Sequence, residues 1–422
     1  MTRNFCFIIC AFLLLVLAGC APRVFPVKVA DETLPSAEEE KQLGYVLSNA
    51  IVQYLGGEYP DNALEHHVNQ VGLHLTRGVG NGQLFVRVAN DSNPLSFALP
   101  GDFVVVTRGL LQVLENESQL AALLAREAGY LQADHVAEHM RFLVRGRTVF
   151  LEDTQPGEPG YSQRLLLLRE LTDMLLLKDD TREHSKSDIA AIDLLARGGY
   201  PLQGFFELDE IWKRHNIMVS GVDRSIDPYQ MSPTRLQNVR DYISANYPNY
   251  RSAADINSTA YIQQMENLHQ LAPAYELYHQ ARQAEAADDQ SAALQLYHQA
   301  TRQHPQSMLL TALGMAYLRG EDLIPARRYL RQAVMADADY YRSRLGLGYI
   351  HLRREEWPDA VVELEASLAL LPTLQGVFLL AEAEEGRGNG VRARSLYQHL
   401  LEVDGRSALG RAAAERLRNL PR

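Results

Sequence analysis

The spacing of apolar residues changes several times along the chain, and each change predicts a different element. From about Ser36, apolar residues recur at helical spacing through "LGYVLSNAIVQYLGG", with Glu38, Glu39 and Glu40 in the first turn, where carboxylates suit the helix dipole. "ALEHHVNQVGLHLTRGV" predicts a second helix. "LFVRVAND" and "SFALPGDFVVVTRGLL" are β-branched and partly alternating, and they predict two strands that form a hairpin or a sheet edge.

Helical spacing then returns. It predicts a long helix over 117–145, a loop at "DTQPGEPGYSQ", and further helices over 165–178 and 187–197. We therefore expect an α+β domain over residues 36–257, mainly helical with a small sheet.

The C-terminal third repeats itself with a period of about 34 residues. Ala293, Ala326, Ala360 and Ala393 mark the period, because they stand 33, 34 and 33 residues apart. Twelve positions before each alanine stands a small residue: Ala281, Gly314, Gly348 and Ala381. Twelve positions after each stands a residue that ends the repeat: Pro305, Ala338, Pro372 and Gly405. Four residues after each alanine stands a large side chain: Tyr297, Leu330, Leu364, Tyr397. This pattern resembles tetratricopeptide repeats, and it predicts an all-α solenoid over 271–422 with a concave, peptide-sized surface. A generic array of helical hairpins is the alternative.

The first 20 residues, "MTRNFCFIICAFLLLVLAGC", combine one early charge with an apolar run too short for a comfortable transmembrane helix. Leu17-Ala18-Gly19-Cys20 resembles a bacterial lipobox, which implies lipid attachment at Cys20, a tether over 21–35 and a periplasmic protein. Ala21 after the cysteine resembles the sorting signal for the outer membrane. An ordinary signal peptide or membrane anchor is the alternative.

Charge and cysteine content narrow the possible partners and cofactors. The net charge of -11 and the lack of a basic stripe argue against a nucleic-acid partner. All three cysteines, Cys6, Cys10 and Cys20, lie in the leader, so the mature chain has no thiolate metal site. Any metal would need histidine and carboxylate ligands.

One segment carries the candidate chemistry: "PLSFALPGDFVVVTRGLLQVLENESQLAALLAREAGYLQADH". It resembles the zinc metallopeptidases of family forty-eight, the HtpX- and BepA-like enzymes, which carry a strand, an "FALPGG"-like turn, "VTxGLL" and a helix with H-E-x-x-H. The similarity spans about residues 37–242, and members of this type often end in tetratricopeptide repeats. "DIAAIDLLARGGYPLQGF" resembles a downstream segment of the same family.

The resemblance implies a zinc site, yet the ligand positions hold other residues. The two helix ligands fall on Arg126 and Tyr130, and the third falls on His184, with the second-shell aspartate kept as Asp188. Of the catalytic motif only the general base remains, as Glu127. A later histidine of some relatives falls near Ser232.

We therefore expect no bound metal, with zinc as cofactor only if the ligands are rearranged. In its place, Arg126 is predicted to pair with Asp188 or Glu127 and so to balance the carboxylates that zinc would otherwise neutralise.

A second metal motif is present as His135-Val136-Ala137-Glu138-His139, which fits the inverted H-x-x-E-H pattern. His135 lies about 180° around the helix from Arg126, at roughly 100° per residue, and so it faces away from the cleft that the resemblance implies. We interpret this match as accidental.

Three functions remain. The first is a lipid-anchored, metal-free pseudopeptidase that acts as a chaperone or envelope assembly factor. It would bind unfolded or assembling polypeptides through its former active-site cleft and its repeats. The second is an active zinc metalloendopeptidase with rearranged ligands. The third is an interaction scaffold in which the repeats alone are functional.

Overall fold

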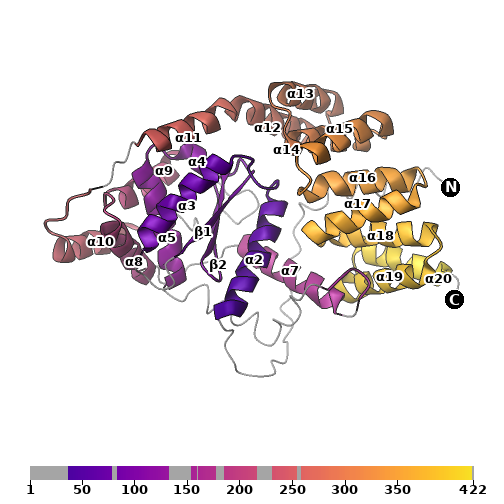
Figure 1. Cartoon of the computed structure of the whole chain (residues 1–422), viewed down its shortest axis with the longest axis horizontal. Helices are drawn as coiled ribbons and strands as arrows, with labels where there is room; N and C mark the ends of the chain where they lie inside the picture. Colours follow the sequence, from indigo (N-terminus) through magenta and orange to yellow (C-terminus); the bar gives the residue numbers. More distant parts are fainter. Residues whose placement is uncertain are drawn as a thin grey trace.

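The computed structural model divides the chain into a mixed half with a small sheet and a C-terminal half built from helices (Figure 1). It describes residues 37–77, 83–132, 154–158, 160–176, 185–215, 231–253 and 258–420. The predicted class is confirmed: an α+β domain precedes an all-α tetratricopeptide-like solenoid. None of the helices in these ranges has the length and apolar content needed to cross a bilayer.

The described sheet has three strands instead of two, because the second β-branched run folds back on itself. β1 (Phe85–Ala89) pairs in parallel with β3 (Phe103–Thr107), and β2 (Ser96–Leu99) pairs antiparallel with β3, so the order is β1-β3-β2. Pro100 and Gly101 make the turn, with Gly101 at φ +68°, where glycine is unstrained. The hairpin, β2–β3, therefore lies inside the second run, and the first run supplies β1, which pairs with β3 in parallel and not as the partner of a hairpin.

Nine helices of the described chain belong to the mixed half or lead out of it: α2 (Ala37–Tyr54), α3 (Asn62–Thr76), α4 (Arg108–Val113), α5 (Glu117–Gln132), α7 (Tyr161–Leu176), α8 (Ser185–Arg197), α9 (Gly204–His215), α10 (Pro233–Asn246) and α11 (Thr259–Gln270). α5 is the central one: residues 120–125 are all buried, and the helix packs on α3, α8, α9 and β2. The predicted extension of this helix over 133–145 lies outside the described residues.

The solenoid stacks helical hairpins in register with the sequence repeat. Its helices are α12 (Ala272–Ala286), α13 (Gln290–Gln303), α14 (Ser307–Arg319), α15 (Leu323–Ala336), α16 (Tyr341–Arg353), α17 (Trp357–Leu370), α18 (Leu374–Gly386), α19 (Gly390–Asp404) and α20 (Ala408–Asn419). A Cβ on Gly314 would lie 2.6 Å from Leu330 Cγ, and one on Gly348 would lie 2.6 Å from Leu364 Cγ. The predicted small residues therefore do lie where the two helices of a hairpin meet.

The solenoid docks on the mixed half at the last turn of α2 and the turn that follows it. Gln53 Nε2 donates to Asp339 O at 2.5 Å, and Gln53 Oε1 accepts from Tyr341 N at 2.9 Å. A Cβ on Gly56, where φ is +96°, would lie 2.9 Å from Met308 Sδ. The turn therefore sits directly against the first residues of α14 and the segment that leads into α16.

A buried polar cluster reinforces this docking. Gln306 Oε1 accepts from Asn90 Nδ2 at 3.1 Å and from the Tyr275 hydroxyl at 2.8 Å. The guanidinium carbon of Arg108 lies 3.6 Å from the centre of the Tyr275 ring, and Arg108 Nε donates to Asn90 Oδ1 at 3.1 Å. Because partially satisfied buried polar groups are costly, this cluster favours one orientation of the two halves.

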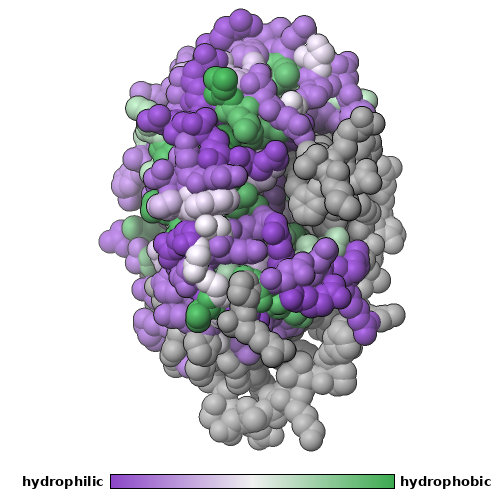
Figure 2. Space-filling view, turned by 90° about the vertical axis from the view of Figure 1, so that its right-hand side faces the viewer, coloured by the Kyte–Doolittle hydropathy of each residue, from purple (hydrophilic) through white to green (hydrophobic). Residues whose placement is uncertain are grey.

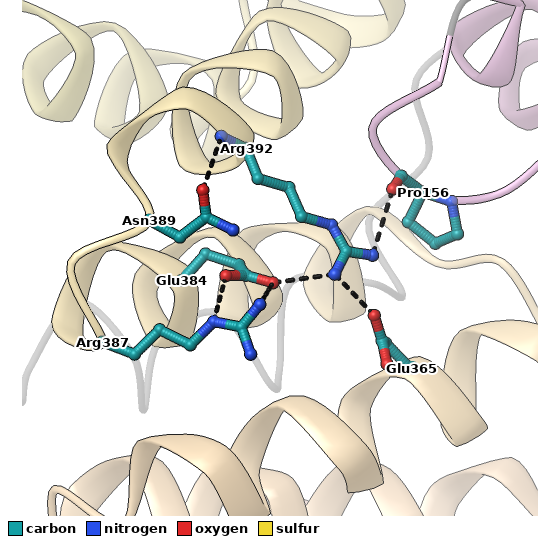
Figure 3. Close-up of polar contacts among 6 residues, drawn as sticks. All are labelled: Pro156, Glu365, Glu384, Arg387, Asn389 and Arg392. Carbon is teal, nitrogen blue, oxygen red and sulfur yellow. Dashed lines mark hydrogen bonds and ion pairs between the residues drawn. The ribbon is translucent and has the colours of Figure 1, made fainter.

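A second docking point joins the last repeats to the segment before α7 (Figure 3). Arg392 donates to Pro156 O at 3.3 Å and pairs with Glu384 at 2.8 Å and with Glu365 at 2.6 Å. Glu384 is fully buried and also pairs with Arg387. α7 packs on both α2 and α19, and the solenoid is therefore held to the mixed half near both of its ends.

Candidate functional site

Close packing of α5 on α8 brings the predicted site residues together. A Cβ on Gly129 would lie 2.4 Å from Ser187 O and 3.0 Å from Ala191 N, so the two backbones almost touch there. The first turn of α8, which carries Asp188, therefore lies against the turn of α5 that carries residues 126–130.

Glu127 is held at the start of the edge strand. It is 7% exposed, and its Oε1 accepts from the hydroxyl of Ser96 at 2.6 Å. Ser96 is the first residue of β2 and is completely buried. This short hydrogen bond fixes the direction of the carboxylate. The sequence analysis did not single out Ser96, although it begins the "SFALPG" run.

Asp188 is bound by both arms of a guanidinium. Arg235 NH2 donates to Oδ1 at 2.6 Å and Arg235 Nε donates to Oδ2 at 2.5 Å. The Asp188 side chain is 3% exposed and that of Arg235 is 15% exposed. Two parallel N–H···O bonds give the strongest geometry that an Arg–carboxylate pair can adopt.

Arg235 lies in the first turn of α10, three residues after Ser232. The Ser232 hydroxyl accepts from Arg235 N at 3.2 Å and caps the helix. Ser232, near which the sequence analysis places a late histidine of some relatives, is therefore a helix cap, and Arg235 follows in the turn that it caps.

The predicted partner of the buried carboxylates was Arg126, and this prediction is corrected. Asp188 is engaged by Arg235, while Glu127 accepts from Ser96. The guanidinium carbon of Arg126 lies 5.8 Å from the centre of the Phe205 ring of α9. The predicted pair was Arg126 with Asp188 or Glu127, and the arginine that pairs with Asp188 is Arg235 of α10.

Tyr130 is partly buried and packs against the apolar cluster between α2 and the sheet. Its neighbours in that cluster are apolar side chains such as Leu47, Phe97 and Val105. The ring therefore contributes to packing of the mixed half.

Comparison with known proteins identifies the family. A model of peptidase family M48 matches residues 62–308, which is more than half of the chain. The chain belongs to peptidase family M48. A search of curated proteins finds no match. Among solved structures, a similar one is that of YrrB, described as a TPR protein with an unusual peptide-binding site. It is 16% identical, aligned over 37% of this chain and 81% of its own, with a TM-score of 0.31.

Arg126 and Tyr130 of α5, which the sequence analysis places at the two helix ligand positions, do not fit zinc. A catalytic zinc takes three protein ligands that carry a free lone pair, with water at the fourth position. Arg126 stays protonated and has no lone pair to offer. Tyr130 packs in an apolar cluster, and a phenol is a poor substitute for a neutral imidazole. Glu127 stands at the position that the sequence analysis assigns to the general base.

Some predicted residues lie outside the described parts of the chain. These are the third ligand position His184, the inverted motif from His135 to His139, and the lipidation site Cys20.

One group of possible metal ligands does occur in the described solenoid, at the turn between α16 and α17. It consists of His351, Glu356 and Asp359. Hydrogen bonds from Arg354 and His351 lower the pKa of Glu356, and Arg354 Nε lies 2.7 Å from Glu356 Oε1. The arginine already neutralises this carboxylate, so we interpret the group as a charge network of the turn.

Proposed function

We propose that this M48 chain is a metal-free pseudopeptidase that binds unfolded or assembling polypeptides, as a chaperone or envelope assembly factor. The observation that carries the proposal is the two-armed pairing of Arg235 with Asp188. In zinc enzymes, second-shell carboxylates orient the metal ligands. Here both oxygens of that carboxylate bind a fixed cation, which compensates its charge without any metal.

The residues at the two predicted ligand positions on α5 support the same proposal. Arg126 and Tyr130 replace both helix ligands, while the scaffold around them keeps the close contact at Gly129 and the hydrogen bond to Glu127. A scaffold that is retained without its ligands is suited to binding a polypeptide without cleaving it. The attachment of the solenoid near both of its ends favours joint action of the two halves over a scaffold of repeats alone.

The metal content of the full-length chain tests this proposal most directly. Elemental analysis of protein purified without chelators is expected to find well under one zinc per chain. The same protein is expected to hydrolyse no unfolded substrate in a manner that a chelator stops. A single tightly bound zinc that disappears in His184→Ala, with chelator-sensitive hydrolysis that is lost in Glu127→Gln, would contradict the proposal and support the active metalloendopeptidase.

We also propose that the mature chain begins at a lipidated Cys20 and faces the periplasm, anchored in the outer membrane. Support comes from the sequence Leu17-Ala18-Gly19-Cys20 after a short apolar run. Several acyl chains anchor a protein stably where a single chain is marginal.

Replacing Cys20 with alanine is expected to move the protein from the membrane fraction to the soluble fraction on cell fractionation. The matched control is Cys10→Ala, which leaves the lipobox intact and should stay in the membrane fraction. An uncleaved wild-type precursor in the membrane would show that the segment is a simple anchor.

A further inference from the structure

The outer helix of the second repeat, α15, carries two of the three most exposed large apolar side chains among the described residues. Ile324 is 82% exposed and Met335 is 84% exposed. The two residues stand eleven positions apart, which is close to three full helical turns, so both side chains project from the same side of α15. Large apolar side chains that share one exposed face indicate a surface that contacts a partner.

Two arginines lie between these apolar residues on the same side of α15. Arg328 and Arg331 follow Ile324 by four and seven positions, and both are exposed. Arg328 NH2 donates to the Tyr329 hydroxyl at 2.9 Å, and the guanidinium carbon lies 4.6 Å from the centre of the Tyr329 ring. Among the described residues, no carboxylate lies within ion-pair distance of either arginine.

The neighbouring outer helix, α13, extends this positive surface. The centre of the His298 ring on α13 lies 5.6 Å from that of the Tyr329 ring on α15, so the two helices meet there. Arg302 follows His298 by one helical turn, is exposed, and also has no ion-pair partner in the part of the chain that the structure describes. Neither α13 nor α15 contains an aspartate or a glutamate, although the whole chain carries a net charge of -11.

The positive surface ends at the third repeat. The outer helix of that repeat, α17, contains three acidic residues and no basic one, and it exposes Val362 to 61%. Arg327, the remaining arginine of α15, is turned toward this side and lies 3.8 Å from Glu356. The charge of the outer face therefore changes sign between α15 and α17, and α17 offers an internal control.

The shape and chemistry of this face suit a lipid surface. Figure 1 places α13 and α15 at the edge of the molecule, away from the sheet, and Figure 2 shows an apolar patch near the upper end of a mainly hydrophilic side. Amphipathic helices bind anionic bilayers with this combination, because apolar side chains enter the headgroup region while arginines bind phosphates. An outer helical face is convex and gives a polypeptide no groove, whereas a bilayer needs none. Salt screens acidic residues beyond about 10 Å, so the local charge decides the contact.

We propose that the outer face of α13 and α15 rests on a bilayer that contains anionic phospholipid. Its two exposed apolar side chains enter the headgroup region, and its three arginines bind lipid phosphates. The residues in contact are Arg302, Ile324, Arg328, Arg331 and Met335. This contact goes beyond the proposed anchoring and does not depend on acylation of Cys20. An acyl anchor would permit it, because the residues from Cys20 to Ala37 span up to about 60 Å when extended.

Flotation with lipid vesicles tests the contact. The chain from Ala21 onward is used, because it keeps every residue that the structure describes and carries neither the leader nor an acyl group. It is expected to float with vesicles of phosphatidylglycerol mixed with phosphatidylcholine, and to stay unbound with vesicles of phosphatidylcholine alone. Added salt is expected to weaken the binding. Equal flotation with both kinds of vesicle, or flotation with neither, would overturn the proposal.

The charge is tested by replacing all three arginines with glutamine, as Arg302→Gln, Arg328→Gln and Arg331→Gln in one chain. This variant is expected to bind the anionic vesicles about a hundredfold more weakly, since each basic residue near such a surface contributes about fivefold. The control is Arg240→Gln, which removes an exposed arginine from α10 and is expected to bind as the parent chain does. Unchanged binding by the triple variant would show that another face meets the lipid.

The apolar part of the contact has its own variant, Ile324→Ser with Met335→Ser. It is expected to weaken vesicle binding at low salt and to abolish the part that persists at high salt, where charge is screened. Val362→Ser on α17 is the matched control, because it removes an exposed apolar side chain from the acidic neighbour. An equal loss in Val362→Ser would contradict the assignment to α15.

A soluble polyanion separates lipid from an acidic polypeptide. If polyglutamate bound the chain through the three arginines while vesicles did not, the face would belong to an acidic polypeptide and the proposal would be wrong. Failure of the lipid contact leaves the other proposals intact, because zinc content tests the pseudopeptidase and fractionation of Cys20→Ala tests the anchor.

Discussion

Arg235→Ala is expected to lower the free energy of unfolding by about 3–5 kcal/mol, the range found when one partner of a buried ion pair is removed. The reason is the environment of Asp188, whose side chain is 3% exposed and whose two oxygens both accept from Arg235. Without the guanidinium the carboxylate stays buried with its charge uncompensated. The shift in the denaturation midpoint, measured by far-ultraviolet circular dichroism in urea, reports the loss.

The matched control lies on the same helix. Arg240 of α10 is exposed, and its guanidinium carbon lies 5.2 Å from the centre of the Phe206 ring. Arg240→Ala removes the same side chain without leaving a buried charge, and its effect is expected to stay below about 1 kcal/mol. Similar losses in Arg235→Ala and Arg240→Ala would show that removal of side-chain packing, not of charge, explains the result.

A double variant tests the electrostatic origin of the loss. Asp188→Asn removes the buried charge, so Arg235→Ala should cost much less in the Asp188→Asn background than in the wild type. Additive losses would mean that the two side chains do not stabilise each other, and the argument for a site balanced without metal would lose its main support.

The sequence analysis predicted that Arg126 pairs with Asp188 or Glu127, and it did not identify Arg235 as the partner of Asp188. Arg126 occupies a ligand position, and this made it the obvious choice. Arg235 is separated from Asp188 by 47 residues, part of which lies outside the described structure. Only the packing of α10 beside α8 brings the two together, and local periodicity carries no information about that packing.

Elements with strong local patterns were predicted well. α2 begins at Ala37 with its three glutamates in the first turn, and the solenoid helices follow the repeat markers. The parallel pairing of β1 with β3 was not predicted, because the spacing of apolar residues identifies strands and does not identify their partners.

The docking of the solenoid on the mixed half was also not predicted from the sequence. Gln53 and Gln306 appear as ordinary polar residues in their segments, yet both are buried and both bridge the two halves. This docking also occupies part of the solenoid: Met308 is 5% exposed and Thr311 is 2% exposed. The start of α14 and the segment that leads into α16 therefore face the mixed half.

Gly348→Leu is expected to destabilise the solenoid by about 1–3 kcal/mol through overpacking. Even a Cβ at this position would lie 2.6 Å from Cγ and 2.7 Å from Cδ2 of Leu364, a residue that is itself fully buried. Because Leu364 has no free space to move into, α16 and α17 must separate. The melting temperature is expected to fall accordingly.

Gly390→Leu is the control, since nothing lies within 4 Å of a Cβ there and the position is the first residue of α19. An unchanged melting temperature for Gly348→Leu would contradict the prediction, and so would an equal fall in the melting temperature of Gly390→Leu. Either result would mean that the repeat pattern of the sequence does not mark the close contact between α16 and α17.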